Sequence, residues 1–206
     1  MNAKTDPDDT GGLGIAALHA LTHEVNAAPD AETALRLVGL AAIARLGDKE
    51  AARRPGALKP GEREHALTAF FLVTPSRDAM LLLGEEGWPS DQHRLIIDIA
   101  EGRPGWVVGN RTPLVLPNTD EDTVFTQIVS SHRMGSSMYA PLLWQGSALG
   151  LISIARQARH SFSRADVPGL ETLAAIAAVA WMAHEGPALL AEIAPGDRLA
   201  LDRVWR

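Results

Sequence analysis

The chain has 206 residues, of which 46% are hydrophobic and 21% charged, and its net charge is −6 at pH 7. These proportions are typical of a globular domain with a buried core, and the acidic balance argues against a general affinity for nucleic acid. The absence of cysteine excludes disulfides, thiolate catalysis, cysteine-ligated zinc and a thioether-linked chromophore.

Neither the start of the chain nor its most apolar stretch indicates export or a membrane span. Residues 1–12 are polar and acidic, carry no recognisable targeting signal, and are predicted to be disordered. The longest apolar run, residues 173–183, is too short to cross a bilayer. We therefore predict a cytoplasmic protein that does not enter a membrane.

The first structured elements are predicted to be two helices. Apolar residues recur at helical spacing over residues 13–27, and Pro29 and Asp30 separate this helix from the next. The second helix has its inner stripe at Leu35, Val38, Ala42 and Leu46 and stops at Gly47. Residues 48–64 are charged, contain two Pro-Gly pairs, and are predicted to form an exposed loop.

A sheet is predicted to begin after this loop. Residues 65–74 and 79–83 form a hairpin around the turn 75–78. Residues 95–100 alternate as a strand does, although a helix is a competing interpretation. One helical turn at 104–108 and a short strand at 113–116 follow.

The second half of the chain is predicted to contain two helices and two strands. Asp120 or Asp122 is predicted to cap a helix that runs to Val129, and strands 137–144 and 148–155 meet at the turn 145–147. Ser163 starts the last long helix, Gly186-Pro187 ends it, and the tail holds two short amphipathic pieces separated by Pro195-Gly196. Antiparallel strands with segregated helices predict an α+β fold.

Several short motifs occur in an order typical of one family. They are Gly-x-Pro-Gly-Trp at 102–106, the strand PLVLPNTD at 113–120, Ser-x-x-x-Pro-Leu at 137–142, the turn at Gly146, Gly-Leu-Ile at 150–152, and Phe162-Ser163 with Asp166. In this order, residues 31–184 resemble a GAF domain, a small-molecule sensing module. The resemblance implies a six-stranded antiparallel sheet, with N- and C-terminal helices packed on one face and a lidded ligand pocket on the other. It favours a single domain over 13–186 and a C-terminal tail over 187–206.

The candidate pocket residues follow from this picture and from strand alternation. Ser137 and Tyr139 share one face of their strand and are predicted to form the pocket floor, whereas Met138 and Ala140 face the other way. The predicted walls are Trp106, Phe125, Ile128 and Val129. Asn118 and Asp120 stand where free amides at a helix start could receive an anion or a carbonyl.

Each of these residues also has a purely structural interpretation. The four wall residues are equally expected in an ordinary core, and Asn118 to Asp120 in a helix cap. The hydroxyl of Tyr139, the one tyrosine, could face a pocket or bond a backbone carbonyl.

The resemblance implies a sensory or regulatory role in signal transduction. The effector would be held without a covalent bond, as a small metabolite or an anion of unknown identity. Methionine sulfoxide reduction, which one GAF subgroup performs with cysteines, is excluded, and the signature of many cyclic-nucleotide-binding relatives is missing. Because the helix containing 173–183 is apolar nearly all round, it must bury more than one side. Its second side could meet the helix over 13–27, a second copy of the chain, or both, and we expect a homodimer through the terminal helices.

Two other classes of function remain open. The chain could be a ligand-free interaction module that docks on a protein partner through its tail. It could also be a small enzyme in which Asp120, Asp122 and His132 lie near the pocket mouth. His19 and His23 have the i, i+4 spacing of a metal pair, but no third ligand is apparent, and we assign no metal or catalytic residue.

Overall fold

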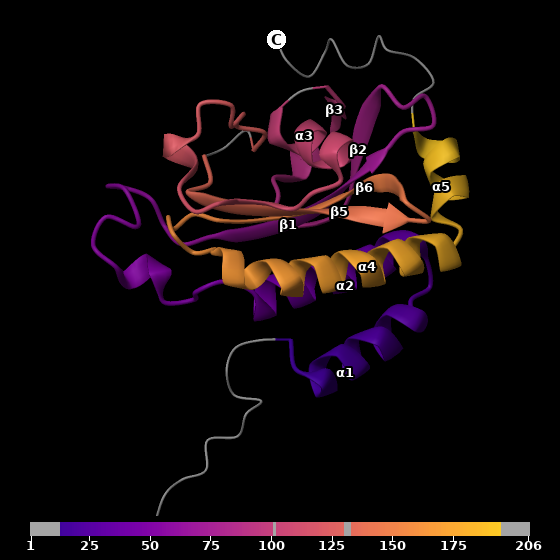
Figure 1. The fold of residues 1–206 in the computed structure, drawn as a ribbon, viewed down its shortest axis with the longest axis horizontal. Helices are drawn as coiled ribbons and strands as arrows, with labels where there is room; N and C mark the ends of the chain where they lie inside the picture. Colours follow the sequence, from indigo (N-terminus) through magenta and orange to yellow (C-terminus); the bar gives the residue numbers. More distant parts are fainter. Residues whose placement is uncertain (1–12, 101, 130–132, 195–206) are drawn as a thin grey trace, which may run out of the picture.

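The computed structural model describes residues 13–100, 102–129 and 133–194. Its centre is a six-stranded sheet in the order β3-β2-β1-β6-β5-β4, with every neighbouring pair antiparallel (Figure 1). The strands are β1 (Ala66–Val73), β2 (Ala79–Glu86), β3 (Ile96–Asp98), β4 (Leu114–Leu116), β5 (Ser136–Trp144) and β6 (Ser147–Arg156). This confirms the predicted α+β fold with a six-stranded antiparallel sheet.

Two tight hairpins form one end of the sheet. Residues 74–78 connect β1 to β2, and Gln145 and Gly146 connect β5 to β6. Both residues of the second turn have positive φ, of 49° and 79°, which matches the twist of the flanking strands. Since Leu72 pairs with Gly150 where β1 meets β6, the two turns lie next to each other.

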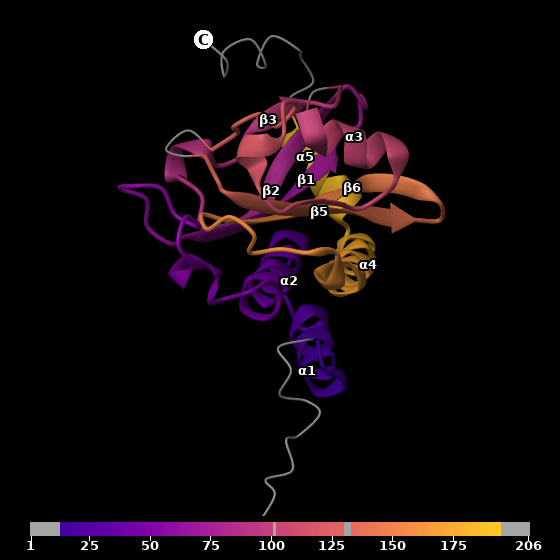
Figure 2. The same cartoon turned by 60° about the vertical axis from the view of Figure 1, so that its left-hand side comes forward.

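Helices cover one face of the sheet in two layers. Helices α2 (Ala31–Arg45) and α4 (Val167–Ala183) pack directly on the strands, and α1 (Ile15–Asn26) packs on these two helices from outside (Figures 1 and 2). The larger core lies between sheet and helices, and its largest members include Leu35, Phe70, Met138, Phe162 and Trp181. The prediction that the N- and C-terminal helices pack on one face of the sheet is therefore confirmed. Helix α1 forms an additional outer layer on that face.

Local capping explains where the two inner helices begin. The Asp30 carboxylate accepts a hydrogen bond from the Thr33 amide at 2.7 Å and caps α2. Ser163 and Asp166 form a reciprocal capping box at the single 3-10 turn that leads into α4.

The opposite face carries shorter elements. Helix α3 (Gly102–Asn110) and the segment 117–129 lie over the strands (Figure 2). A second apolar cluster fills the space beneath them, with Phe71, Leu82, Val107, Tyr139 and Leu151 among its buried members. We call this side of the sheet the lid face.

Three predicted elements differ from the structure. Helix α3 has nine residues and is longer than the single turn expected at 104–108. Helix α4 ends at Ala183 because Glu185 takes a left-handed conformation, and Gly186 and Pro187 begin a further helix, α5 (Gly186–Ile193). The expected strand at 95–100 is limited to β3.

The predicted helix from Asp120 or Asp122 to Val129 is wrong. One 3-10 turn spans Thr119–Glu121, and residues 122–129 are irregular. The Asp122 side chain accepts a hydrogen bond from the Val124 amide at 2.9 Å, and side chains bond the carbonyls of Ile128 and Val129. Such side-chain bonds to the backbone compete with helical hydrogen bonds. The predicted disorder of residues 1–12 and the second tail piece lie outside the described residues.

Candidate ligand site

The lid face of β5 carries the two polar side chains that were predicted to form the pocket floor. Tyr139 belongs to the apolar cluster under the lid, whereas Met138, Ala140 and Leu142 belong to the helix-side core. Strand alternation places Ser137 on the same side as Tyr139. The predicted division of this strand into two faces is therefore confirmed.

Both hydroxyl groups are deeply buried. Tyr139 is 5% exposed, and its burial raises the pKa of the phenol to about 12, so the group is neutral across the physiological range. Ser137 is 1% exposed, and its Oγ forms no hydrogen bond of normal length with the described residues, although an interaction with the Ser137 hydroxyl opposes the rise in the pKa of Tyr139, which places the two hydroxyls close to each other. A buried hydroxyl without a partner costs roughly 1–3 kcal/mol, so Ser137 is an unusual residue to retain in a packed interior.

The ion pair between Arg103 and Asp122 lies close enough to Tyr139 to affect the pKa of its phenol. The Arg103 guanidinium donates from Nε to the Asp122 carboxylate at 3.1 Å and from Nη2 to its second oxygen, so α3 is joined to the segment 117–129. The Asp122 charge contributes to the raised pKa of Tyr139, and the Arg103 charge opposes it. Burial alone would raise the pKa of Asp122, but the bonds from Arg103 and the Val124 amide hold it below its usual value.

The predicted wall residues occupy different positions. Phe125 and Ile128 are partly buried and pack against the lid-face cluster. Val129 is buried in a smaller neighbouring cluster with Leu67, Met134 and Ala155. Trp106 is 41% exposed, since α3 turns Val107 and Val108 toward the sheet instead. The structure therefore does not bring Trp106 together with the buried members of the lid face.

Asn118 and Asp120 have structural partners. The Asn118 side chain accepts from the Asp120 amide at 3.2 Å and caps only the single 3-10 turn. Asp120 pairs with Lys59 at 2.8 Å, with Arg159 at 3.0 Å and with Arg133 at 3.5 Å. Because no longer helix follows this turn, the expected helix start with free amides for an anion is not formed.

Sequence reasoning missed several residues that shape this region. Arg103 was not singled out, and no periodic signal marks it. Arg133 was also missed, although its guanidinium lies 4.6 Å from the centre of the Phe125 ring and donates to the Thr119 carbonyl. Val107 and Val108 are adjacent apolar residues in the motif Gly-Trp-Val-Val-Gly, which is the one signal that could have favoured them over Trp106.

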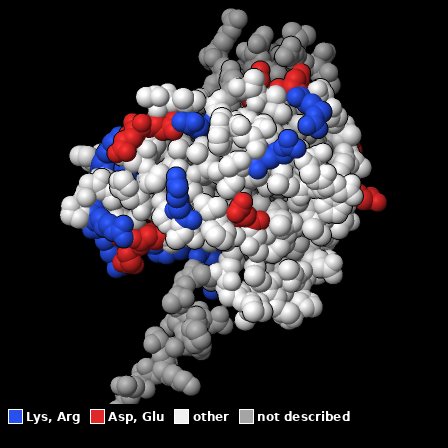
Figure 3. All heavy atoms as spheres, in the orientation of Figure 1, with Lys and Arg blue, Asp and Glu red and all other residues white. Residues whose placement is uncertain are grey.

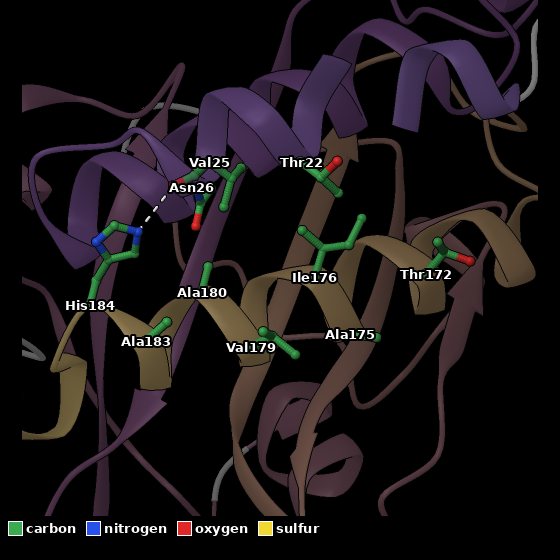
Figure 4. Close-up of a pocket in the computed structure, with 10 residues that line it drawn as sticks. All are labelled: Thr22, Val25, Asn26, Thr172, Ala175, Ile176, Val179, Ala180, Ala183 and His184. Carbon is green, nitrogen blue, oxygen red and sulfur yellow. Dashed lines mark hydrogen bonds between the residues drawn. The ribbon is translucent and has the colours of Figure 1, made fainter. Parts of the chain in front are cut away.

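A groove of about 420 Å³ runs between α1 and α4 on the helix side (Figure 4). Its lining is mostly apolar and comprises Thr22, Val25, Asn26, Thr172, Ala175, Ile176, Val179, Ala180, Ala183 and His184. A hydrogen bond of 3.0 Å between His184 Nε2 and the Val25 carbonyl links the two helices, and Val179 is 56% exposed. Figure 3 shows that the face over α4 and α1 is nearly free of charged side chains.

Helix α4 and the 3-10 turn before it form a stretch, Arg164–Ala183, that is long and apolar enough to cross a membrane by length and composition. Its residues Leu170, Leu173, Ala177 and Trp181 are nevertheless part of the core against the sheet. We therefore interpret α4 as a core helix.

His93, Glu85 and Glu32 form a small polar cluster with ligand atoms within 4.8 Å of one another. Arg94 Nη2 lies 2.7 Å from the Glu32 carboxylate, and His93 Nδ1 contacts Glu85. The arginine neutralises part of the acidic charge, so this arrangement is that of an ion-pair network. The rings of His19 and His23 are 4.5 Å apart on exposed positions of α1.

A six-stranded antiparallel sheet with helices on one face and short elements on the other defines an α+β domain with a GAF-like fold. The GAF domain model matches residues 64–181, more than half of the chain, and the protein belongs to the GAF domain family. GAF domains are typically small-molecule-binding sensory or regulatory modules.

Solved structures support the same fold. The GAF domain of a phosphoenolpyruvate-protein phosphotransferase from Coxiella burnetii is 22% identical with a TM-score of 0.67, and the match covers 84% of this chain and 94% of that one. The corresponding domain from Acinetobacter is 16% identical with a TM-score of 0.66, covering 89% and 97%. Comparison of the sequence with curated proteins gave no match.

An enzyme is also among the similar structures. Free methionine-R-sulfoxide reductase from Neisseria meningitidis, solved in complex with its substrate, is 17% identical with a TM-score of 0.64, covering 90% of this chain and 96% of that one. Such reductases use catalytic cysteines, and this chain has none, so it lacks that route.

Proposed function

We propose that this GAF domain is a sensor that binds a small effector without a covalent bond on the lid face, at Ser137 and Tyr139. The observation that carries the proposal is the buried Ser137 hydroxyl, which forms no hydrogen bond of normal length with the described residues and lies close to the Tyr139 phenol on the same face. A ligand that bonds this hydroxyl would remove the cost of leaving it unsatisfied.

The surroundings suggest the chemistry of the effector. Phe71, Leu82 and Val107 supply apolar surface, and the neutral Tyr139 can both donate and accept a hydrogen bond. The Arg103–Asp122 pair is already matched in charge. We therefore expect the effector to be a small, mainly apolar molecule with one or two hydrogen-bonding groups. We also expect the protein to act in the cytoplasm.

The signal requires a second structural state. The Arg103–Asp122 pair joins α3 to the segment 117–129, so an effector that displaces or orders these elements would favour one arrangement of the lid. An effector shifts that equilibrium only by the difference in its affinity for the two arrangements.

We further propose that two copies associate through α1 and α4. The groove between these helices is mostly apolar, its lining residue Val179 is exposed, and the surface around it is nearly free of charged side chains. A twofold interface needs such a self-complementary surface. The second copy would cover the part of α4 that α1 leaves exposed, at Val179.

A thermal-shift screen of small metabolites, nucleotides and tetrapyrroles, followed by calorimetric titration of each hit, tests the effector site. A true effector should bind the wild type and lose at least about tenfold in affinity in Tyr139→Phe, which removes a single hydroxyl. Tyr139→Phe should retain the wild-type fold by circular dichroism. The proposal fails if no compound stabilises the protein, or if hits bind Tyr139→Phe and Ser137→Ala as tightly as the wild type.

A further inference from the structure

A second hollow lies at the hairpin end of the sheet, away from Ser137 and Tyr139. Its volume is about 480 Å³. Its lining comes from four segments that are distant in sequence: the β1–β2 turn, the end of β3, α3 with the residue after it, and the start of β6. The lining residues are Arg77, Ile99, Gly105, Val108, Gly109, Arg111, Ser147 and Ala148. None of them is among the residues predicted for the effector pocket.

The positions of the two hairpins explain why this hollow exists. The turns of β1–β2 and β5–β6 are neighbours because β1 pairs with β6, and Figure 2 shows α3 lying above the β5–β6 end of the sheet. Arg111 Nη1 donates to the Gly146 carbonyl at 2.9 Å, so it joins the end of α3 to the second turn. This bond positions Arg111 at the hollow, which Arg77 lines from the neighbouring turn.

The charge of the lining is entirely positive. Arg77 and Arg111 contribute two guanidinium groups, and the lining contains no acidic residue. Within the described part of the chain, no ion pair or side-chain hydrogen bond involves Arg77. The nearest carboxylates in sequence have other partners, since Asp78 accepts from the Ser76 hydroxyl and Asp98 accepts from the Ala100 amide at 2.7 Å.

Arg77 and Arg111 are exposed, and they differ from the more buried arginines of the protein in having no carboxylate partner among the described residues. Arg103, Arg156 and Arg159 each face a carboxylate. Two arginines that share a hollow without a carboxylate repel each other, and an anion between them would remove that repulsion. Guanidinium groups favour carboxylate and phosphate oxygens because their donors match the spacing of these acceptors.

Both arginines have an uncommon backbone conformation. Arg77 and Arg111 have φ angles of 60° and 53°, in the left-handed region. This conformation costs a non-glycine residue roughly 1–2 kcal/mol, whereas glycine adopts it freely. Arg94, Gln145, His160 and Glu185 share this conformation elsewhere in the described chain, so the proposal rests on the charge and the lining of the hollow.

The remaining lining limits the kind of molecule that fits. Ile99 and Val108 offer apolar surface, Ser147 offers a hydroxyl, and an added side chain at Gly109 would meet no atom within 4 Å. The space therefore suits a small organic anion with its charged group on the arginines and its carbon skeleton against Ile99 and Val108.

We propose that this hollow is a second ligand site, which binds a small metabolite through an oxyanion group, phosphate or carboxylate, held between Arg77 and Arg111. The site is separate from the proposed effector site and does not depend on it. The two sites share α3, so occupancy of one would alter the other through this helix.

Isothermal titration at low ionic strength tests this site with pyrophosphate and citrate as probes, because salt screens exposed charge pairs. Saturable binding of pyrophosphate alone supports a phosphate site, and binding of citrate alone supports a carboxylate site. Arg77→Gln and Arg111→Gln should each weaken binding at least about tenfold, as expected for a lost charged hydrogen bond.

Two matched controls separate a built site from general charge attraction. Arg36→Gln and Arg164→Gln remove the same charge from exposed positions outside the hollow and should leave the affinity unchanged. Gly109→Leu keeps both arginines but places a bulky side chain at the hollow, and it should abolish binding even if an arginine variant fails to fold. The proposal is overturned if neither probe binds saturably, if the control variants lose as much affinity as the lining variants, or if Gly109→Leu binds normally.

Discussion

Arg103 on α3 and Asp122 on the irregular segment 117–129 form a partly buried ion pair with two hydrogen bonds, one of them 3.1 Å long. The two residues are separated by β4 in sequence, and both segments lie on the lid face. This pair fixes the segment where sequence periodicity predicted a helix, and it lies near the buried Tyr139.

The first prediction concerns pH. Asp122 has a lowered pKa in the folded protein, so its ion pair stabilises the fold above the ordinary carboxyl pKa of about 4, and this contribution is lost as pH falls through the folded value. Asp122→Asn should therefore lower the free energy of unfolding by roughly 1–2 kcal/mol at pH 7 and by less near pH 3. Chemical denaturation at several pH values measures the difference. Asp91→Asn, at an exposed position, is the control, and an equal loss in both variants at every pH would contradict the prediction.

Tyr139 gives a second prediction, because it is the one tyrosine in the chain. Its burial should shift the phenolate absorbance midpoint from about 10 to about 12. Since the folded pKa lies above that of the unfolded chain, the stability it provides is complete below pH 10 and decreases as pH rises toward 12. Absorbance titration measures the ionisation of the phenol, and far-UV circular dichroism over the same pH range shows whether the fold is intact. A midpoint near 10 with the fold intact would show that the phenol is exposed.

Two glycines of α3 provide a third, matched prediction. A Cβ at Gly105 would lie 2.1 Å from the Ile99 carbonyl oxygen, whereas a Cβ at Gly109 would meet nothing within 4 Å. Alanine favours a helix over glycine by roughly 0.5–1 kcal/mol. We expect Gly109→Ala to be neutral or slightly stabilising and Gly105→Ala to destabilise by about 1–3 kcal/mol because the backbone must move. Thermal and chemical unfolding measure the stability of both variants. Equal effects of the two substitutions would show that α3 does not pack as described.

Neighbouring serines on β5 give a fourth prediction with opposite signs. Ser136 donates to the Leu116 carbonyl at 3.1 Å and accepts from the Phe162 amide at 3.3 Å, whereas the Ser137 hydroxyl forms no hydrogen bond of normal length in the described part of the chain. Ser136→Ala should cost roughly 1–3 kcal/mol, and Ser137→Ala should leave the ligand-free protein unchanged or more stable. Denaturant titration of the free protein measures both. A large loss in Ser137→Ala would mean that its hydroxyl is already satisfied without an effector.

The proposed dimer gives the fifth prediction. Val179 on α4 is 56% exposed, and Val124 on the opposite side of the sheet is 52% exposed. The same substitution can therefore be tested at the proposed interface and, as a control, on the other face. Val179→Glu should produce a monomer, because a carboxylate would be buried at the interface, whereas Val124→Glu should retain the wild-type mass. Light scattering coupled to size exclusion measures this. A monomeric wild type, or a dimeric Val179→Glu protein, would rule out association through α4.

Periodic and turn-forming residues predicted most of the fold because their information is local. Alternation over residues 137–144, the turn at Gln145-Gly146 and the cap at Ser163 need no distant partner, and the structure has each of them. The prediction of a helix over 122–129 failed for the opposite reason. Its apolar spacing is helical, but Asp122 is bonded to Arg103 and the Ile128 carbonyl to Gln92, and both partners come from other segments.

The sequence alone determined the exclusion of cysteine chemistry and the two faces of β5, which follow from composition and short-range periodicity, and the order of its motifs carried the resemblance to the GAF family and its antiparallel sheet. The tertiary structure decided which side chains meet: it turned Trp106 outward, paired Arg103 with Asp122, left the Ser137 hydroxyl buried, and brought Arg77 and Arg111 to one hollow. Contacts between segments far apart in the chain depend on how helices and hairpins pack, and no local pattern records that packing.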